Sequence, residues 1–164
     1  MILRIAKTAL VCAIALYLTL IAVNNVADYH SNYQFVRHVL MMDSTFPGNA
    51  LMWRALNSPA WHTVCYWTIT VSEFVAALLC WWGALRLAKS LKKEPSEFRE
   101  AKNAAIVGLT VGLLLFLVAF LIVGGEWFLM WQSKTWNGQQ SALRMFAIIG
   151  IVLLFLVQPE GGNQ

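Results

Sequence analysis

The sequence predicts an all-α membrane protein, a four-transmembrane-helix bundle with a partly helical outer-face segment between helices one and two. Hydrophobic residues make up 59% of the chain, charged residues make up 12%, and the apolar residues gather in four long runs. Soluble domains average about 25% charged residues, so a water-soluble fold of this length would lack the polar groups to cover its surface. We therefore expect one integral membrane domain over residues 1–164, with the lipid bilayer as its solvent.

The predicted spans cover about residues 5–23, 61–87, 104–131 and 141–157. A helix needs ~20 residues to cross the hydrocarbon core, and the fourth run lies near the lower limit of ~17. Because backbone polar groups in lipid must be satisfied within their own segment, each run should be a helix. The first run follows Arg4 and Lys7, as in a signal peptide, but its long apolar core and the missing cleavage motif favour a retained span.

Basic residues predict the orientation of the chain. Eight of the 12 lysines and arginines fall on one side of the expected membrane: Arg4, Lys7, Arg86, Lys89, Lys92, Lys93, Arg99 and Lys102. Cytoplasmic loops carry the excess of basic residues, so both termini and the loop 88–103 should be cytoplasmic. Topology thus explains the net charge of +4, and we expect no nucleic-acid partner. The eight tryptophans fall near the ends of the spans, as interfacial anchors do.

The outer segment 24–59 is the longest stretch outside the predicted spans. Residues 33–42 have apolar residues at helical spacing, residues 43–49 have the composition of a turn, and residues 50–56 favour another short helix. Ser58 could cap the second span, with Pro59 as its first residue. In the cytoplasmic loop, Ser96 is a possible cap for the third helix.

Glu73 is the candidate of greatest interest inside the membrane. At 100° per residue, one face of the second span is polar or small, whereas the opposite face is bulky and apolar. That polar or small face comprises His62, Tyr66, Thr70, Glu73, Ala77, Cys80 and Ala84. A polar stripe in a membrane helix should face the other helices, so Glu73 is expected to be buried there, either protonated or paired.

Glu126 and Arg144 are the other candidates inside the membrane. Gly108, Gly112, Ala119 and Glu126 share a face if the third span is a regular α-helix, and Gly108 and Gly112 form a small-xxx-small element for close packing. Arg144 begins the fourth span at about the same depth as Glu126. An ion pair between the two is the simplest expectation, and a substrate or ion site is the alternative.

A group of polar residues is predicted near the outer face, namely Asp28, His30, His38, His62 and Arg54. Histidines and carboxylates could suggest a metal site, but their spacing matches no known ligand pattern. Catalytic motifs of the common hydrolase, metalloprotease and phosphate-binding types are also missing from the sequence. We therefore expect no metal, no cofactor and no catalytic residue.

The outer segment resembles a known family. Residues 32–43, the run Thr45–Asn49 and the pair Trp53–Arg54 look like those of a bacterial family of predicted small integral membrane proteins of unknown function. The resemblance covers nearly the whole chain and implies a bacterial inner-membrane location, without implying an activity.

Three functions are compatible with this sequence. The leading hypothesis is a non-enzymatic accessory or assembly partner, bound to another membrane protein or to itself, because the helices offer small-residue packing faces. The alternative is a small proton- or cation-coupled transporter or channel that uses Glu73. A third possibility, an enzyme acting on lipid or quinone, has no recognisable nucleophile or cofactor site.

Overall fold

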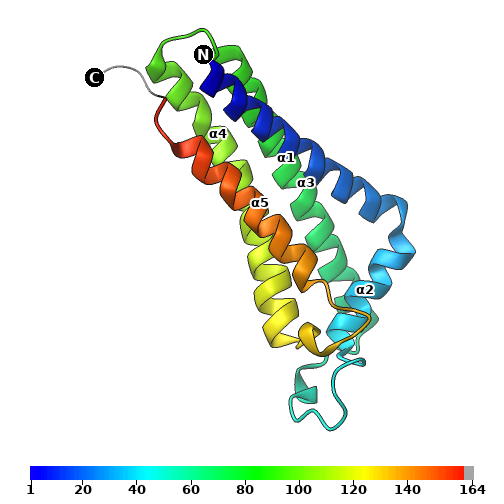
Figure 1. The fold of residues 1–164 in the computed structure, drawn as a ribbon. Helices are drawn as coiled ribbons and strands as arrows, with labels where there is room; N and C mark the ends of the chain where they lie inside the picture. The colour runs from blue at the N-terminus through cyan, green and yellow to red at the C-terminus, as the bar shows by residue number, and fades with distance from the viewer. Residues whose placement is uncertain (161–164) are drawn as a thin grey trace.

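The computed structural model describes residues 1–160 as a set of helices (Figure 1). Four of its helical stretches are long and apolar enough to cross a membrane, as the sequence predicts: Ile2–Ala27, Pro59–Ser90, Pro95–Trp127 and Gln139–Val157. In chain order the elements are α1 Ile2–Ala27, α2 Tyr29–Met41, η1 Met52–Arg54, α3 Pro59–Ser90, α4 Pro95–Leu114, η2 Leu115–Trp127, η3 Met130–Gln132 and α5 Gln139–Val157.

The long helices run side by side along one axis (Figure 1). α3 packs against both α1 and α4, and α5 packs against α4, η2 and α1. The start of α1 and the end of α5 lie at one end of the molecule, which we call the basic end, and α2 with its loops lies at the other, which we call the α2 end. The arrangement of the helices thus places residues distant in sequence at the same end.

Two glycines bring α3 and α4 into close contact. A Cβ added at Gly108 would lie 2.6 Å from the backbone nitrogen of Cys80, and one added at Gly83 would overlap the backbone of Ala105. Small residues allow helix backbones to approach closely in lipid. The predicted packing role of Gly108 is therefore confirmed, whereas the role of Gly83 was not anticipated.

The third span changes its helical type along its length. From Leu115 to Trp127 it is a π-helix, in which each N–H bonds to the fifth carbonyl before it. The wider turns rotate later residues away from the positions that a regular α-helix would give them. The prediction that Glu126 shares the face of Gly108 and Gly112 is therefore wrong, because both glycines are buried but Glu126 is exposed.

A cluster of charged side chains connects the helices at the basic end. Lys7 and Lys102, which are 1% and 4% exposed, both reach Glu160 Oε1, at 2.7 and 2.5 Å respectively. Both ammonium groups also donate to the carbonyl oxygen of Gln158, and Arg4 donates to the carbonyl oxygens of Leu91 and Lys93. This cluster joins α1, α4 and the segment after α5. We call Lys7, Lys102 and Glu160 the lysine clamp.

Glu160 lies outside the membrane-spanning helices, and its surroundings shift its acidity. Burial raises the pKa of this carboxyl, but hydrogen bonds from Lys102 and Lys7 outweigh that effect and bring the pKa below its ordinary value. Charged ammonium donors favour the ionised carboxylate. The clamp is therefore an ionic contact at neutral pH.

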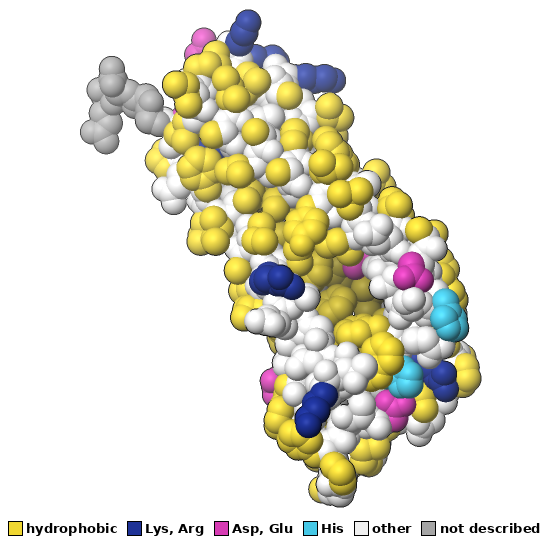
Figure 2. All heavy atoms as spheres, turned by 45° about the vertical axis from the view of Figure 1, so that its right-hand side comes forward, with side chains coloured by type: hydrophobic (Ala, Val, Ile, Leu, Met, Phe, Trp, Pro, Cys, Tyr) yellow, Lys and Arg dark blue, Asp and Glu magenta, His cyan; other side chains and the backbone are white. Residues whose placement is uncertain are grey.

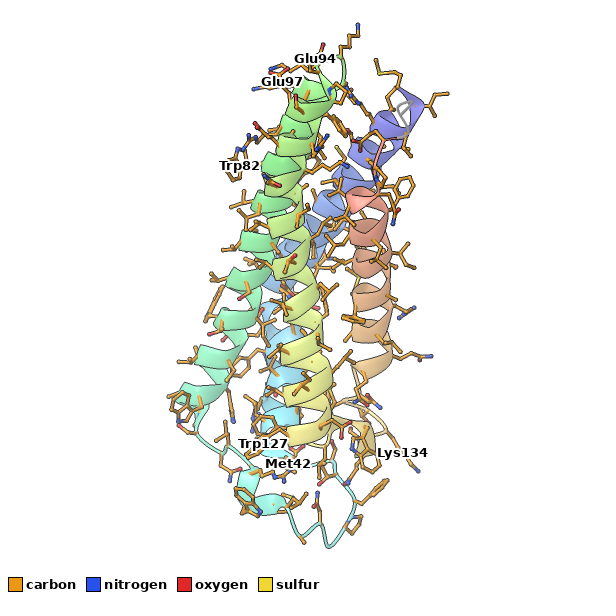
Figure 3. The ribbon with its side chains drawn as sticks, turned by 90° about the vertical axis from the view of Figure 1, so that its left-hand side faces the viewer. Met42, Trp82, Glu94, Glu97, Trp127 and Lys134 are labelled. Carbon is orange, nitrogen blue, oxygen red and sulfur yellow. The ribbon has the colours of Figure 1, made fainter. Side chains whose placement is uncertain are left out.

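Tryptophans lie toward both ends of the molecule. Figure 3 shows Trp82 toward the basic end and Trp127 beside the loops at the α2 end. Both side chains are exposed, as interfacial anchors require. Trp81 differs, since its indole is partly buried and donates to the hydroxyl of Thr19 at 3.0 Å.

The connecting segments differ in detail from the expectation. α2 begins at Tyr29, and the short helix predicted near residues 50–56 is the single 3-10 turn η1. Pro59 starts α3 as predicted, but the side chain of Ser58 makes no capping hydrogen bond. α4 begins at Pro95, one residue before the predicted cap, because the ring of proline fixes the backbone angle φ at a value that suits the first position of a helix.

The third span begins and ends earlier in the chain than predicted, since it covers Pro95–Trp127 instead of residues 104–131. The helix ends at Trp127, and Leu129 takes a left-handed conformation with φ of 53° before the η3 turn. The apolar residues after Trp127 pack beneath α2 instead of continuing the helix, with Phe128, Leu129 and Met130 in one buried cluster with Val39 and Leu40.

Candidate functional site

The polar or small face of α3 is buried, as the sequence predicts. Its members from His62 to Ala84 lie against the other helices, and Glu73 is 1% exposed. The carboxyl of Glu73 accepts a hydrogen bond of 2.6 Å from the side-chain amide of Asn25. An ionisable group at this depth requires a partner, and Asn25 is that partner.

Asn25 connects α1 to α3 through two groups. Its side chain donates to Glu73, and its backbone carbonyl accepts a hydrogen bond from the hydroxyl of Tyr66 at 2.5 Å. Thr70 completes this face by donating to the carbonyl of Tyr66. α1 continues to Ala27, four residues beyond the predicted span, and this extension carries Asn25 to the depth of Glu73.

Glu73 lies in the wall of a cavity of about 470 Å³. This cavity, which we call the Glu73 cavity, lies between α1, α2, α3, η2 and α5. Its volume falls within the range of small-molecule sites, about 300–1,000 Å³. Figure 2 shows the surface hollowed, with hydrophobic side chains visible inside and a basic side chain beside the opening. Its lining includes Tyr17, Asn25, Asn32, Tyr66, Phe116, Phe120, Asn137 and Arg144.

Arg144 stands at the rim of the Glu73 cavity. Its side chain is exposed and donates to the hydroxyl of Ser141 at 3.0 Å. Within the described residues 1–160, no ion pair joins Arg144 to Glu126, so the expected pair does not form. The π-helix explains this, because it turns Glu126 to the outside while α5 directs Arg144 toward the cavity.

The predicted outer polar residues do not form one site. Asp28 caps α2 by accepting from the backbone of Ser31, and His30 is exposed. His38 pairs with Asp43 at 2.7 Å and stacks on Trp136.

The remaining two lie elsewhere at the α2 end. His62 is buried and bonds through Nε2 to the carbonyl of Leu56, and Arg54 donates to the carbonyl of Trp127. Among residues 1–160, no group of three or more His, Cys, Asp or Glu side chains could hold a metal ion.

The site therefore combines one deep carboxyl with aromatic walls and three amides. A carboxylate in an apolar, aromatic surrounding can bind a proton or a cation, and ring faces add to the attraction for an organic cation. Sequence reasoning missed Asn25, Asn137 and the cavity itself. Asn25 lies beyond the first apolar run, where a polar residue normally marks the end of a span, so nothing local indicated its role.

These features define a small helical protein of the membrane-spanning class, with a cavity whose wall contains one buried carboxyl. The chain belongs to the family described as predicted small integral membrane protein (DUF2165), which matches residues 3–159. No curated protein and no solved structure matches the chain in the same comparisons. The family agrees with the resemblance of the outer segment and leaves the activity open.

Proposed function

We propose that this protein is a small bacterial inner-membrane transporter that binds an organic cation or a proton at Glu73. The observation that carries the proposal is the position of Glu73, a buried carboxyl in the wall of a ligand-sized cavity. An acid kept inside a membrane protein at the cost of desolvation is a functional candidate by default. Asn25 would hold the carboxyl in position whether or not it carries a proton.

The chemistry of the cavity favours an organic cation over a bare metal ion. Sites for divalent metal ions usually combine several charged ligands, whereas Glu73 is the single carboxylate of this cavity. Phe116, Phe120 and Tyr66 provide ring surfaces that suit an alkylated ammonium or phosphonium group. The charged and titratable side chains that line the cavity besides Glu73 are Tyr17, Tyr66 and Arg144.

Packing within the chain accounts for one of the features that suggested an accessory role. Gly108, one of the small residues that suggested a partner helix, lies close to the backbone of Cys80 within this chain. An accessory subunit or a homo-oligomer remains the second candidate. It would be favoured if a stoichiometric partner copurified from native membranes in mild detergent.

The orientation is part of the same proposal. The lysine clamp and Arg4 would lie at the cytoplasmic surface, and the α2 end would face outward, because basic residues favour the cytoplasmic side. The Glu73 cavity would then exchange its ligand with the outer half of the membrane or its surface. A reporter fused after Gln164 should remain cytoplasmic, and its appearance outside would overturn this orientation.

The decisive experiment is a binding assay with radiolabelled tetraphenylphosphonium on the purified protein. Glu73→Gln should keep the contact with Asn25 and the thermal stability, yet weaken binding by at least about tenfold, because the loss of the counter-charge costs at least about 1.4 kcal/mol. Glu126→Gln is the matched control, since it removes an exposed acid, and it should bind like the wild type.

Arg144→Gln provides a test in the opposite direction. The guanidinium at the rim opposes a cation in the cavity, so its removal should strengthen tetraphenylphosphonium binding by a few-fold, about 1 kcal/mol or less for a solvated charge.

Proteoliposomes would separate binding from transport, through efflux of the same cation driven by a pH gradient. Equal binding by wild type and Glu73→Gln would overturn the proposal and leave Glu73 as a structural hydrogen-bond partner.

A further inference from the structure

A second cavity adjoins the Glu73 cavity, with which it shares the wall residues Phe35, Val36, Ile69 and Phe120, but it differs in its chemistry. It has a volume of about 610 Å³ and lies between α2, α3 and η2. Apolar side chains such as Val39, Leu40, Ile69 and Val123 form most of its walls, and the side-chain hydroxyl of Thr68 is a rare polar group among them. A polar ligand would lose its hydration there with few partners in return, so the occupant must be an apolar chain.

The open side of this apolar cavity faces the membrane. Trp61 of α3 and Val118 and Val123 of η2 line the cavity and are also exposed on the outer surface of the helices. α3 and the third span are in close contact where Gly83 and Gly108 lie, and they separate at the level of η2, where the cavity fills the space between them. Lipid is the medium at that surface, so an acyl chain can enter from the side.

The positively charged side chain of Arg54 lies beside this cavity at the α2 end. The guanidinium of Arg54 lies 4.5 Å from the ring of Trp127, a residue of the cavity wall, and 5.4 Å from the ring of Trp53. Within residues 1–160 its one hydrogen bond goes from Nη1 to the carbonyl of Trp127, and it makes no ion pair. Arginine offers five donors suited to phosphate, so donors remain for a ligand.

We infer that this apolar cavity binds one acyl chain of an anionic glycerophospholipid and that Arg54 binds the phosphate of the same lipid. The inference rests on the apolar walls of the cavity, its opening toward the membrane and the arginine beside it. The two tryptophans beside the guanidinium sit at the level where lipid headgroups meet the hydrocarbon core. The apolar acyl chain of the lipid thus suits the apolar cavity, and its anionic phosphate suits the arginine at the mouth of the cavity. The inference of a lipid site does not rest on the cation binding proposed for Glu73.

The test uses delipidated full-length protein titrated with phosphatidylglycerol or phosphatidylcholine carrying brominated acyl chains. Bromine quenches tryptophan fluorescence on contact, and native mass spectrometry counts the lipids retained. The wild type should retain one phosphatidylglycerol per chain and bind it about fivefold more tightly than phosphatidylcholine, the effect of one basic residue near a headgroup. Arg54→Gln should bind the two lipids equally. Arg86→Gln is the matched control, because Arg86 also lies over a tryptophan ring, that of Trp82, and it should keep the preference.

Two substitutions that fill the cavity test the place of the acyl chain. Ala119→Phe and Thr68→Trp add bulk to the cavity wall and should reduce retention of both lipids. Leu154→Phe adds the same kind of bulk on the exposed face of α5 and should have no effect. Thermal melting identifies any variant that fails to fold. If one of the two cavity-filling variants does not fold, lipid retention by the other one tests the place of the acyl chain. Wild type without a retained lipid, equal binding of both lipids by wild type, or a preference unchanged in Arg54→Gln would each overturn the inference.

Discussion

Replacing Glu160 by glutamine is expected to lower the free energy of unfolding by about 3 kcal/mol, because it leaves two buried lysines without their shared counter-ion. Lys7 and Lys102 are 1% and 4% exposed, and their ammonium groups lie 2.7 and 2.5 Å from the same carboxylate oxygen. Removing the carboxylate is costly because each buried ammonium group loses its counter-charge and keeps only the neutral carbonyl of Gln158. Thermal melting of the purified protein in detergent measures the effect.

Glu97→Gln is the matched control for this prediction. Glu97 pairs with Lys93, four residues earlier in the chain, but both side chains are about half exposed, at 51% and 53%. Solvated pairs of this kind contribute about 0.3–0.5 kcal/mol, so the control should melt close to the wild type. Similar melting temperatures for both variants would show that the lysine clamp adds little to stability.

The same clamp predicts how stability depends on pH. The pKa of Glu160 is lower in the folded protein than its ordinary value, so the clamp stabilises fully above the pKa of the unfolded carboxyl, about 4.3. This contribution is lost as the pH falls through the lower folded pKa. The melting temperatures of wild type and Glu160→Gln should therefore converge over the pH range below about 4.3. A constant difference across that range would contradict the assignment to Glu160.

Gly83→Ala and Gly108→Ala should each destabilise the protein by about 2 kcal/mol, because the added methyl group meets backbone and cannot be accommodated by a side-chain rotation. At Gly108 the new Cβ would lie 2.6 Å from the backbone nitrogen of Cys80. At Gly83 it would overlap the backbone of Ala105. Relief requires α3 and α4 to move apart, which loses contacts along both helices.

Gly150→Ala controls for the effect of alanine itself. A Cβ at Gly150 would lie 3.6 Å from the side chain of Leu113, an ordinary contact, and alanine favours a helix over glycine by about 1 kcal/mol. This variant should be as stable as the wild type or slightly more stable. Equal melting of all three variants would mean that α3 and α4 can separate without loss.

The sequence alone determined the helices and the buried face of α3. Each depends on local properties, namely the length of an apolar run and the 100° step between residues of an α-helix. For that reason the four long apolar helices were predicted, and Glu73 was correctly expected to face inward. The glycine at 108 could be assigned to packing because small residues have that role in any membrane helix.

The tertiary structure alone decided which groups meet. Asn25 reaches Glu73 because α1 continues past its apolar run and lies against α3, and Glu160 reaches Lys7 because the last helix returns to the first. Glu126 turned outward because the third span becomes a π-helix, which no periodicity assumed in advance could include. Contacts between helices depend on their relative depth and rotation, and these are set by packing between distant segments, so a pattern within one segment cannot contain them.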